Sequence, residues 1–139
     1  MYDVIRPVRV SSIHLPVPSD DRLTAITDGL LADPGDRRSL ADWADDVGAS
    51  VRTLTRLFAT ETGMTFSQWR QQARIRAALG PLANGASVGQ VARQIGYSNP
   101  SAFVHAFHRI TGQTPGAYFN VTEHGMVAGA SRSDQRSTP

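Results

Sequence analysis

The sequence contains one helical pattern twice, and this repeat limits the folds open to the chain more than any other feature. The first copy reads SLADWADDVGASVRTLTRLFATETG from Ser39, and the second reads SVGQVARQIGYSNPSAFVHAFHRITG from Ser87. Each copy has a short amphipathic segment, a glycine, and a longer amphipathic segment that ends at a second glycine. This order is typical of a helix-turn-helix. The chain is therefore predicted to be all-α and to contain two such units.

Capping residues and apolar periodicity predict about seven helices between residues 20 and 120. The first begins at Asp20 or Asp21, and the last is a short helix after Thr114-Pro115. The longer helices of the two units, which we expect to act as recognition helices, cover about 50–62 and 99–111.

Each unit is expected to open with a capping box, in which a helix-capping serine is paired with a polar residue three positions later. Ser39 is followed in this way by Asp42, and Ser87 by Gln90. In the second unit Pro100 also falls in the first turn of the longer helix, where proline is well tolerated.

The helix that links the units contains an irregularity. Its apolar positions predict a helix over about 65–82, but Gly80 and Pro81 fall near its end. Proline removes a backbone hydrogen bond and disfavours helical geometry in the residue before it. We therefore expect a kink or an early end near Leu79, which would leave the spacing of the two units less fixed.

The chain divides into three parts. Residues 1–19 contain three prolines and are predicted to be an extended linker or the remnant of an upstream domain. Residues 20–120 hold the two units, which cover about 20–63 and 87–120. Residues 121–139 are rich in Ser, Gly and Arg, have little to bury, and are predicted to be a disordered tail.

Charge is distributed unevenly along the sequence. Residues 1–46 carry five Arg and nine Asp, whereas residues 47–120 carry seven Arg and one Glu. All 14 basic residues are Arg, which binds phosphate and guanine through two parallel hydrogen bonds. A GC-rich genome would also favour Arg codons, but it would not explain the clustering. An anionic partner is therefore expected at the repeat.

Composition excludes several classes of protein. The chain has no cysteine, which rules out disulfides, thiolate zinc sites and cysteine nucleophiles. It has no apolar run of 18 residues and no secretory signal at its N-terminus, so no membrane association is expected. These features fit a cytoplasmic protein.

The outward face of each recognition helix would decide what a unit binds. In a helix-turn-helix the second helix lies in the major groove of DNA and presents this face to base edges. A helical wheel places Arg52, Thr53, Arg56 and Thr60 on the first such face. Arg52 and Arg56 are one turn apart, and each can pair with a guanine. The alternative is a solvated surface with two arginines, which the repeat disfavours.

The second face is nearly uncharged at neutral pH. It carries Pro100, Ser101, Val104, His105 and His108. Val104 can touch a thymine methyl, but no arginine is present to bind guanine, so we expect a weaker or more degenerate second half-site. The two histidines lack a third metal ligand, and Ser101 lacks an orienting acid, so neither a metal site, a cofactor nor a nucleophile is expected.

Other arginines and two helix N-termini are candidates for phosphate contacts, which position a protein on DNA without reading its sequence. Some of these arginines could instead pair with acids, and Arg74 could pack between the units. The candidates are Arg38, Ser39, Arg70, Arg74, Ser87, Arg93 and Arg109.

Two stretches resemble the DNA-binding domain of AraC/XylS-type transcription regulators. They read GASVRTLTRLFATETGMTFSQWRQQARI and VARQIGYSNPSAFVHAFHRITGQTPGAYF, and the second is the more specific. The resemblance covers about residues 20–120. It implies a homeodomain-like fold of two helix-turn-helix subdomains joined by a central helix, with recognition helices in successive major grooves of double-stranded DNA. The base contacts it implies are Arg52, Thr55, Arg56, Pro100, Ser101 and His105.

The chain departs from that family in two respects besides the Gly-Pro pair of the linker helix. His105 stands where family members often have arginine. Members also usually carry a separate effector-binding or dimerisation domain, whereas only 19 residues precede the first predicted helix. Because HLPVPSDDRL resembles an interdomain linker, we favour a fragment of a longer regulator over a standalone unit. A missing effector or dimerisation domain and RNA polymerase are the protein partners that this reading implies.

Two other functional classes compete with a sequence-specific transcription regulator. A helical protein-interaction module would use Asp42, Asp45, Asp46 and the N-terminal arm, and its binding to DNA would not depend steeply on salt. Some DNA-repair alkyl-acceptor enzymes carry a similar helical domain, but their chemistry needs cysteine, which this chain lacks. The sequence therefore predicts a DNA-binding regulator that is not an enzyme.

Overall fold

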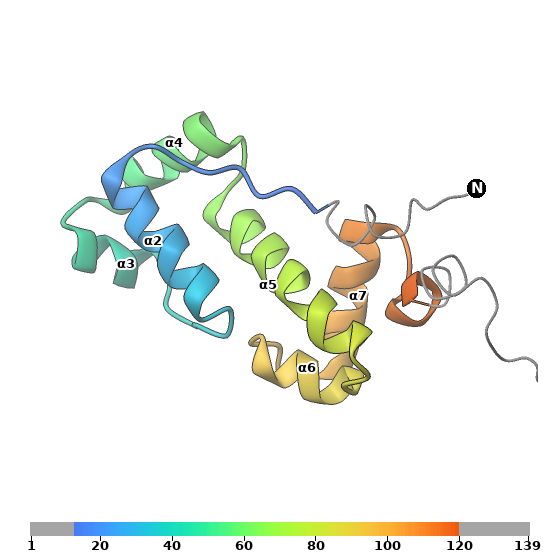
Figure 1. Ribbon diagram of the computed structural model, residues 1–139. Helices are drawn as coiled ribbons and strands as arrows, with labels where there is room; N and C mark the ends of the chain where they lie inside the picture. The colour runs from blue at the N-terminus through green and yellow to red at the C-terminus, as the bar shows by residue number, and fades with distance from the viewer. Residues whose placement is uncertain (1–12, 120–139) are drawn as a thin grey trace, which may run out of the picture.

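The computed structural model describes residues 13–119, so the expectations for residues 1–12 and for the tail after residue 119 lie outside the described residues. The described part is helical and contains no strand, which confirms the all-α prediction. Residues 115–119 form a short final helix. The six longer helices are α2 (Asp21–Ala32), α3 (Leu40–Val47), α4 (Val51–Thr62), α5 (Phe66–Ala83), α6 (Val88–Gln94) and α7 (Pro100–Thr111) (Figure 1).

Side-chain caps determine where the helices begin. Ser39 accepts a hydrogen bond from the amide of Asp42, and the Asp42 carboxylate accepts one from the amide of Ser39, so the predicted capping box of α3 is complete. At α6 the Ser87 hydroxyl accepts from the amide of Gln90, but the exposed Gln90 side chain does not return the bond. The second predicted capping box is therefore only half formed.

The repeated glycine of the two units has a common conformational cause. Gly48 follows α3 with φ of 73°, and Gly96 follows α6 with φ of 98°. Residues with a side chain rarely adopt this left-handed region. Glycine is therefore required where each unit turns from its short helix towards its recognition helix.

Each unit has its own hydrophobic core, and α5 contributes to both. The N-terminal half of α5 adds Trp69 and Ala73 to the first core, and its C-terminal half adds Ile75 and Leu79 to the second. The remaining main contributors to the first core are Leu23, Ile26, Leu30, Trp43, Leu54 and Phe58, and those to the second are Val91, Ala92, Ile95, Phe103, Phe107 and Tyr118. The change from one core to the other occurs within one residue, at position 74.

The linker helix is not interrupted where the sequence predicted it. α5 continues through Pro81 to its C-cap at Asn84, so the early end expected near Leu79 is wrong. The ring of Pro81 is exposed, and Leu82 packs against the second core, which holds the last turn in place. The amide of Asn84 donates to the carbonyl of Gly80 at 3.0 Å, so the helix ends with a regular hydrogen bond.

Residues 13–19, here called the N-terminal strap, lie against both units. Ile13 is buried in the second core and Leu15 in the first. The indole Nε1 of Trp69 donates to the carbonyl of Pro16 at 2.9 Å. The amide of Ser19 donates to the Glu61 carboxylate at 2.8 Å. Figure 1 shows this segment running above α5 in the view on its way to α2. The strap belongs to no helix or strand, and it packs as part of the fold.

Candidate DNA-binding surface

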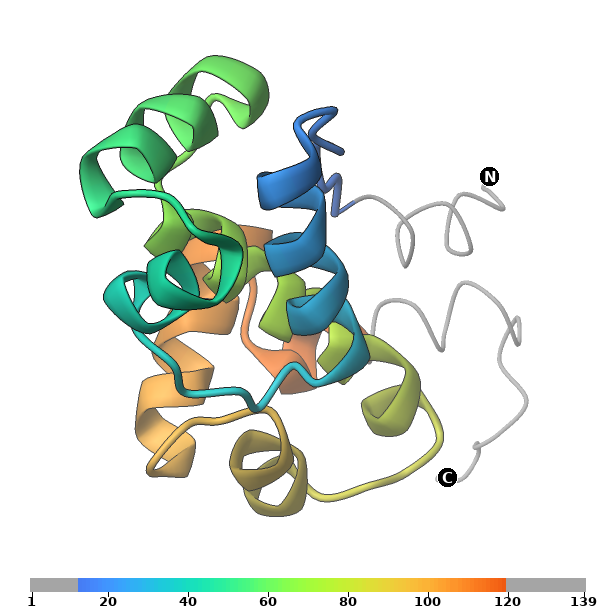
Figure 2. The same ribbon diagram turned by 90° about the vertical axis from the view of Figure 1, so that its left-hand side faces the viewer.

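The two recognition helices lie on the same side of the molecule. In Figure 2, α4 and α7 lie towards the left, whereas α2 and the strap lie towards the right. In Figure 1, α5 runs between the first unit and the second. The outward faces of α4 and α7 can therefore meet a single ligand that is long enough to span both units.

The exposed face of α4 carries unpaired arginines. Leu54 and Phe58 turn inward and are fully buried, which leaves Arg52 and Arg56 exposed on the other side. Within residues 13–119 neither arginine has a hydrogen-bond or ion-pair partner. Two guanidinium groups with all their donors available suit a ligand with acceptor groups.

The threonines of this face differ in availability. Thr55 and Thr60 are exposed, whereas Thr53 is partly buried. The Ser50 hydroxyl donates to the Thr53 hydroxyl at 3.0 Å, and the Thr53 amide donates to the Ser50 hydroxyl at 3.0 Å. Thr53 therefore contributes to the N-cap of α4, and of these threonines it has the least freedom to contact a ligand.

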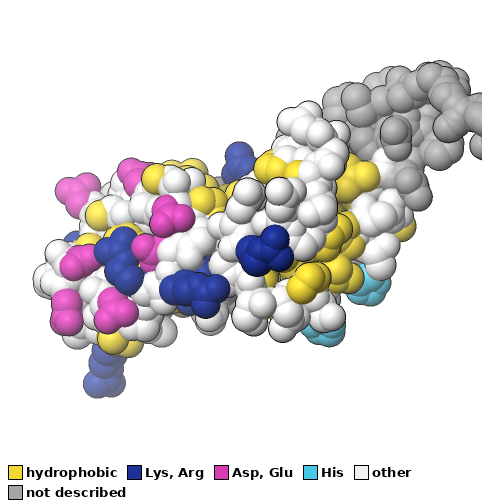
Figure 3. Space-filling model, turned by 90° about the horizontal axis from the view of Figure 1, so that it is seen from below, with side chains coloured by type: hydrophobic (Ala, Val, Ile, Leu, Met, Phe, Trp, Pro, Cys, Tyr) yellow, Lys and Arg dark blue, Asp and Glu magenta, His cyan; other side chains and the backbone are white. Residues whose placement is uncertain are grey.

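The corresponding face of α7 is a shallow hollow whose lining contains no arginine. Phe103, Ala106 and Phe107 are buried beneath it. The open hollow has a volume of about 470 Å³, and its lining is Pro100, Ser101, Val104, His105, His108 and Thr114. Figure 3 shows histidine side chains beside exposed hydrophobic ones at the right of the view. The structure thus brings together all the residues that the sequence assigned to this face.

The two units carry very different backgrounds of charge. Figure 3 shows acidic side chains only over the half of the molecule that contains α2 and α3. From residue 62 to residue 119 the sequence has five arginines and no Asp or Glu. The face of the second unit is therefore free of acids that would repel a polyanion.

Arg38 is held within the first unit. Its guanidinium pairs with Asp36 at 2.9 Å and with Asp46 at 2.7 Å, and its Cζ lies 3.6 Å from the centre of the Trp43 ring. Burial raises the pKa of Asp36, but the Arg38 guanidinium outweighs this and holds that pKa below its ordinary value. Arg38 therefore neutralises neighbouring acids, which is the alternative to a phosphate contact that the sequence left open.

Arg70 and Arg74 on α5 also have intramolecular partners. Arg70 donates to the carbonyl of Arg38 at 2.6 Å and lies over the ring of Phe66. Arg74 donates through Nε to the carbonyl of Pro34 at 2.9 Å. Burial lowers the pKa of both arginines, although guanidinium stays charged in proteins. Both side chains hold parts of the fold together, which is the intramolecular role that the sequence left open beside a phosphate contact.

The remaining phosphate candidates differ in what surrounds them. At Ser39 the Asp42 carboxylate occupies the N-terminus of α3, where it would repel a phosphate. Ser87 has no acid beside it, and Arg93 on α6 is exposed. Arg109 on α7 donates to the Gln71 side chain of α5.

Two exposed arginines were missed by the sequence reading. Arg37 lies in the loop before α3, and Arg76 lies on α5. Neither falls on a recognition helix or at a capping position, so the signals used for the other candidates did not single them out. Exposure depends on how α5 and the loop pack, which periodicity alone does not reveal.

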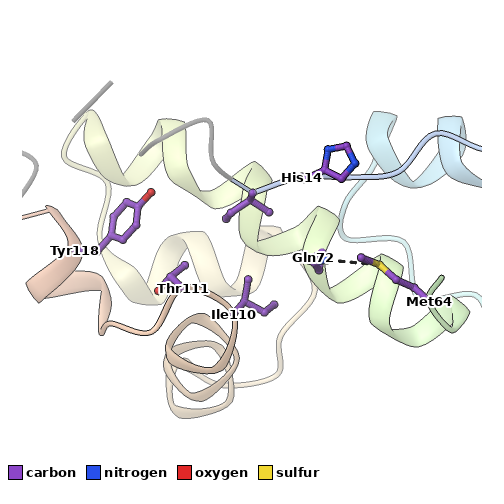
Figure 4. A pocket seen from close by; sticks show the side chains of 7 residues that line it. His14, Met64, Gln72, Ile110, Thr111 and Tyr118 are labelled. Atoms are coloured by element: carbon purple, nitrogen blue, oxygen red, sulfur yellow. Dashed lines mark hydrogen bonds between the residues drawn. The ribbon is translucent and has the colours of Figure 1, made fainter. Parts of the chain in front are cut away.

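A hollow of about 330 Å³ lies where the strap, α5 and α7 meet, and its lining includes His14 but no acid (Figure 4). Among residues 13–119 no group of three or more His, Asp or Glu could hold a metal ion. None of the described helices combines the length and the apolar character needed to cross a membrane.

The chain is similar in sequence to several transcription regulators. Residues 43–120 match a family model described as a helix-turn-helix domain. The HTH-type transcriptional regulator NimR of Escherichia coli is 36% identical over 118 residues, and RipA of Corynebacterium glutamicum is 37% identical over 103 residues. The alignments cover 85% and 74% of this chain but 43% and 31% of those proteins, so the chain spans less than half of their length.

Solved structures show the same fold. The DNA-binding domain of AdpA, a global transcriptional factor in complex with a target DNA, gives a TM-score of 0.69 at 27% identity, over 79% of this chain and 100% of that one. A transcriptional regulator of Chromobacterium violaceum with an AraC-type DNA-binding domain gives 0.67 at 25% identity, over 73% and 91%. The chain belongs to the helix-turn-helix family and is an AraC-type DNA-binding domain.

Proposed function

We propose that this chain is the DNA-binding part of a transcription regulator, and that it places α4 and α7 in successive major grooves of one duplex. The observation that carries this proposal is the position of two exposed recognition faces on one side of an AraC-type fold. AdpA, a relative in fold, binds a target DNA through its corresponding domain. Successive major grooves on one side of B-DNA lie about 34–36 Å apart, so two linked units can each enter one.

In this proposal the first unit supplies the strong contact. Arg52 and Arg56 are exposed and unpaired within the described residues, so each can donate two parallel hydrogen bonds to O6 and N7 of guanine. Thr55 and Thr60 are exposed near these two arginines, whereas Thr53 is bonded to Ser50 at the N-cap of α4. We expect a half-site that contains guanine.

The second unit supplies a contact of different chemistry. Pro100 and Val104 offer apolar surface for a thymine methyl, and Ser101, His105 and His108 offer hydrogen bonds. Ser87 and Arg93 are the phosphate contacts that we retain for this unit, because no acid competes for them. A half-site richer in thymine is expected here.

Selection of bound sequences from a random pool of duplexes tests the proposal. We expect one enriched motif with two half-sites about one helical turn apart. Binding to that motif should weaken with salt, with a slope of log K against log salt of about −0.9 for each phosphate neutralised. A pool without enrichment and an affinity that does not change with salt would reject DNA binding and favour a protein-interaction module.

A further inference from the structure

The loops of the two units meet at a joint beside α5. The α2–α3 loop belongs to the first unit, and the end of α6 at Gln94, with the turn that follows it, belongs to the second. A Cβ atom added to Gly35 of the first loop would lie 2.7 Å from the backbone oxygen of Gln94. This distance is too short for a real contact, so the two backbones can approach this closely only because residue 35 is glycine.

The side chain of Arg74 occupies the centre of this joint. Its Nε donates to the carbonyl of Pro34 at 2.9 Å, and its Nη2 donates to the carbonyl of Asp36 at 2.8 Å, which ties α5 to the first unit. On the other side, a Cβ atom added to Gly96 would lie 2.8 Å from the Arg74 guanidinium. The same guanidinium lies 5.7 Å from the centre of the Tyr97 ring. One side chain therefore contacts the loops of both units.

The position of Arg74 along α5 makes this contact a geometric restraint. Ala73 belongs to the first core and Ile75 to the second, so Arg74 lies at the point where the helix passes from one unit to the other. Rotation of the second unit about α5 would pull Gly96 and Tyr97 away from the guanidinium. The partly buried Arg74 side chain would then lose its packing against Gly96 and Tyr97.

We propose that Arg74 is a positioning residue that fixes α7 relative to α4 and thereby sets the spacing of half-sites that the protein accepts. The inference rests on the proposed DNA binding, but it concerns spacing and not binding itself. One inserted base pair moves a half-site by about 3.4 Å along the duplex and turns it by about 35°. A rigid joint cannot follow this movement, whereas a loosened joint can.

The test compares three duplexes made from the selected motif, one with the selected spacing, one with an inserted base pair, and one with the first half-site alone. The variant is Arg74→Met, which keeps an unbranched apolar stem but has no donors. Arg76→Met is the matched control, because it removes the same charge from an exposed position on the same helix. Circular dichroism and thermal unfolding establish that each variant is folded.

Wild-type protein should lose about tenfold or more in affinity for the duplex with the inserted base pair, as it would for a mismatched site. In Arg74→Met this penalty should shrink to about threefold or less, while affinity for the single half-site stays within about twofold of wild type. Arg76→Met should keep the wild-type penalty, even if its affinity falls on every duplex.

A folded Arg74→Met protein with the wild-type penalty would overturn the inference, as would an equal loss on all three duplexes. If Arg74→Met does not fold, Gly35→Ala answers the same question, because its Cβ pushes the two units apart at the joint without removing the Arg74 guanidinium. It should also reduce the penalty, and an unchanged penalty would count against the joint. If the proposed DNA binding is itself wrong, the wild-type protein will already fail to bind the duplex with the selected spacing.

Discussion

In the first unit the exposed face of α4 carries Arg52 and Arg56, whereas the equivalent positions of α7 are Ser101 and His105. The residues beneath these faces do not differ in this way, because Phe58 and its counterpart Phe107 are both fully buried. Packing constrains the inner side of a recognition helix, while the outer side is free to change with the ligand. The repeat therefore preserves a scaffold and not a binding preference.

The units also differ in how their arginines are used. In the first unit Arg38 is paired with acids of the same unit, and Arg70 is bonded to a backbone carbonyl there. No Asp or Glu occurs from residue 62 to residue 119, so the arginines of the second unit have no carboxylate in this range to pair with. To attract an anionic ligand, the first unit thus has two unpaired arginines beside many acids. The second unit has fewer exposed arginines but no neighbouring acids to repel such a ligand.

The largest expected effect tests whether the two cores are equivalent. Phe58→Ala and Phe107→Ala each remove a fully buried ring, one from each core. Each should lower the free energy of unfolding by about 3–5 kcal/mol, measured by urea titration. A loss below about 1 kcal/mol at either position would mean that this unit does not depend on its core as the other does.

The difference between the two recognition faces is tested next. Arg56→Ala should cost about 1–3 kcal/mol of affinity for the selected motif and relax the preference for guanine at one position. His105→Ala should cost less, because it removes no bidentate pair. Mobility-shift titrations of both variants on the same duplex measure the ranking. An equal loss, or a larger loss at His105, would reverse the assignment of the strong and weak half-sites.

The helix caps provide a comparison within the scaffold. Ser39 belongs to a complete capping box, whereas Ser87 makes only one of the two bonds. Substitution of a capping serine by alanine costs about 0.5–2 kcal/mol. We expect Ser39→Ala in the upper part of this range and Ser87→Ala in the lower part, measured by thermal unfolding. The reverse order would show that the reciprocal bond of Asp42 adds no stability.

The smallest expected effect concerns the thymine contact of the second unit. Replacing thymine by deoxyuridine in the duplex removes only the C5 methyl group. In the half-site of α7 this should weaken binding by roughly 0.8 kcal/mol at one or two positions, the value of one buried methylene. The same replacement in the half-site of α4 is the control and should have no effect. Equal sensitivity in both half-sites would contradict a separate role for Val104.

Much of the fold and of the binding faces could be predicted from the sequence, because the signals involved are local. Ser39 and Asn99 cap helices through bonds to residues three positions away, and such bonds follow from the order of residues. The faces of α4 and α7 follow from a 3.6-residue period. Exposure of Arg52 and Arg56 on α4 therefore agrees with the helical wheel.

What the sequence could not decide concerns contacts between distant parts of the chain. For Arg74 the sequence left open a phosphate contact or packing between the units, because its acceptors lie 38 and 40 residues away in a loop whose path the sequence does not reveal. Pro81 was expected to kink α5 or to end it near Leu79, yet the helix continues to Ala83, and Leu82 packs on the second core. At Pro81 tertiary packing overrode a local preference.

The N-terminal strap moves the N-terminal boundary of the folded domain to a position before α2. A shortened chain that starts at Asp20 would keep every described helix, but it would lose Ile13 from the second core and Leu15 from the first. Each of these side chains is worth roughly 1.5–3 kcal/mol when buried. The indole of Trp69 would also lose its acceptor, the carbonyl of Pro16. The boundary that matters for stability therefore lies no later than Ile13, before the first described helix.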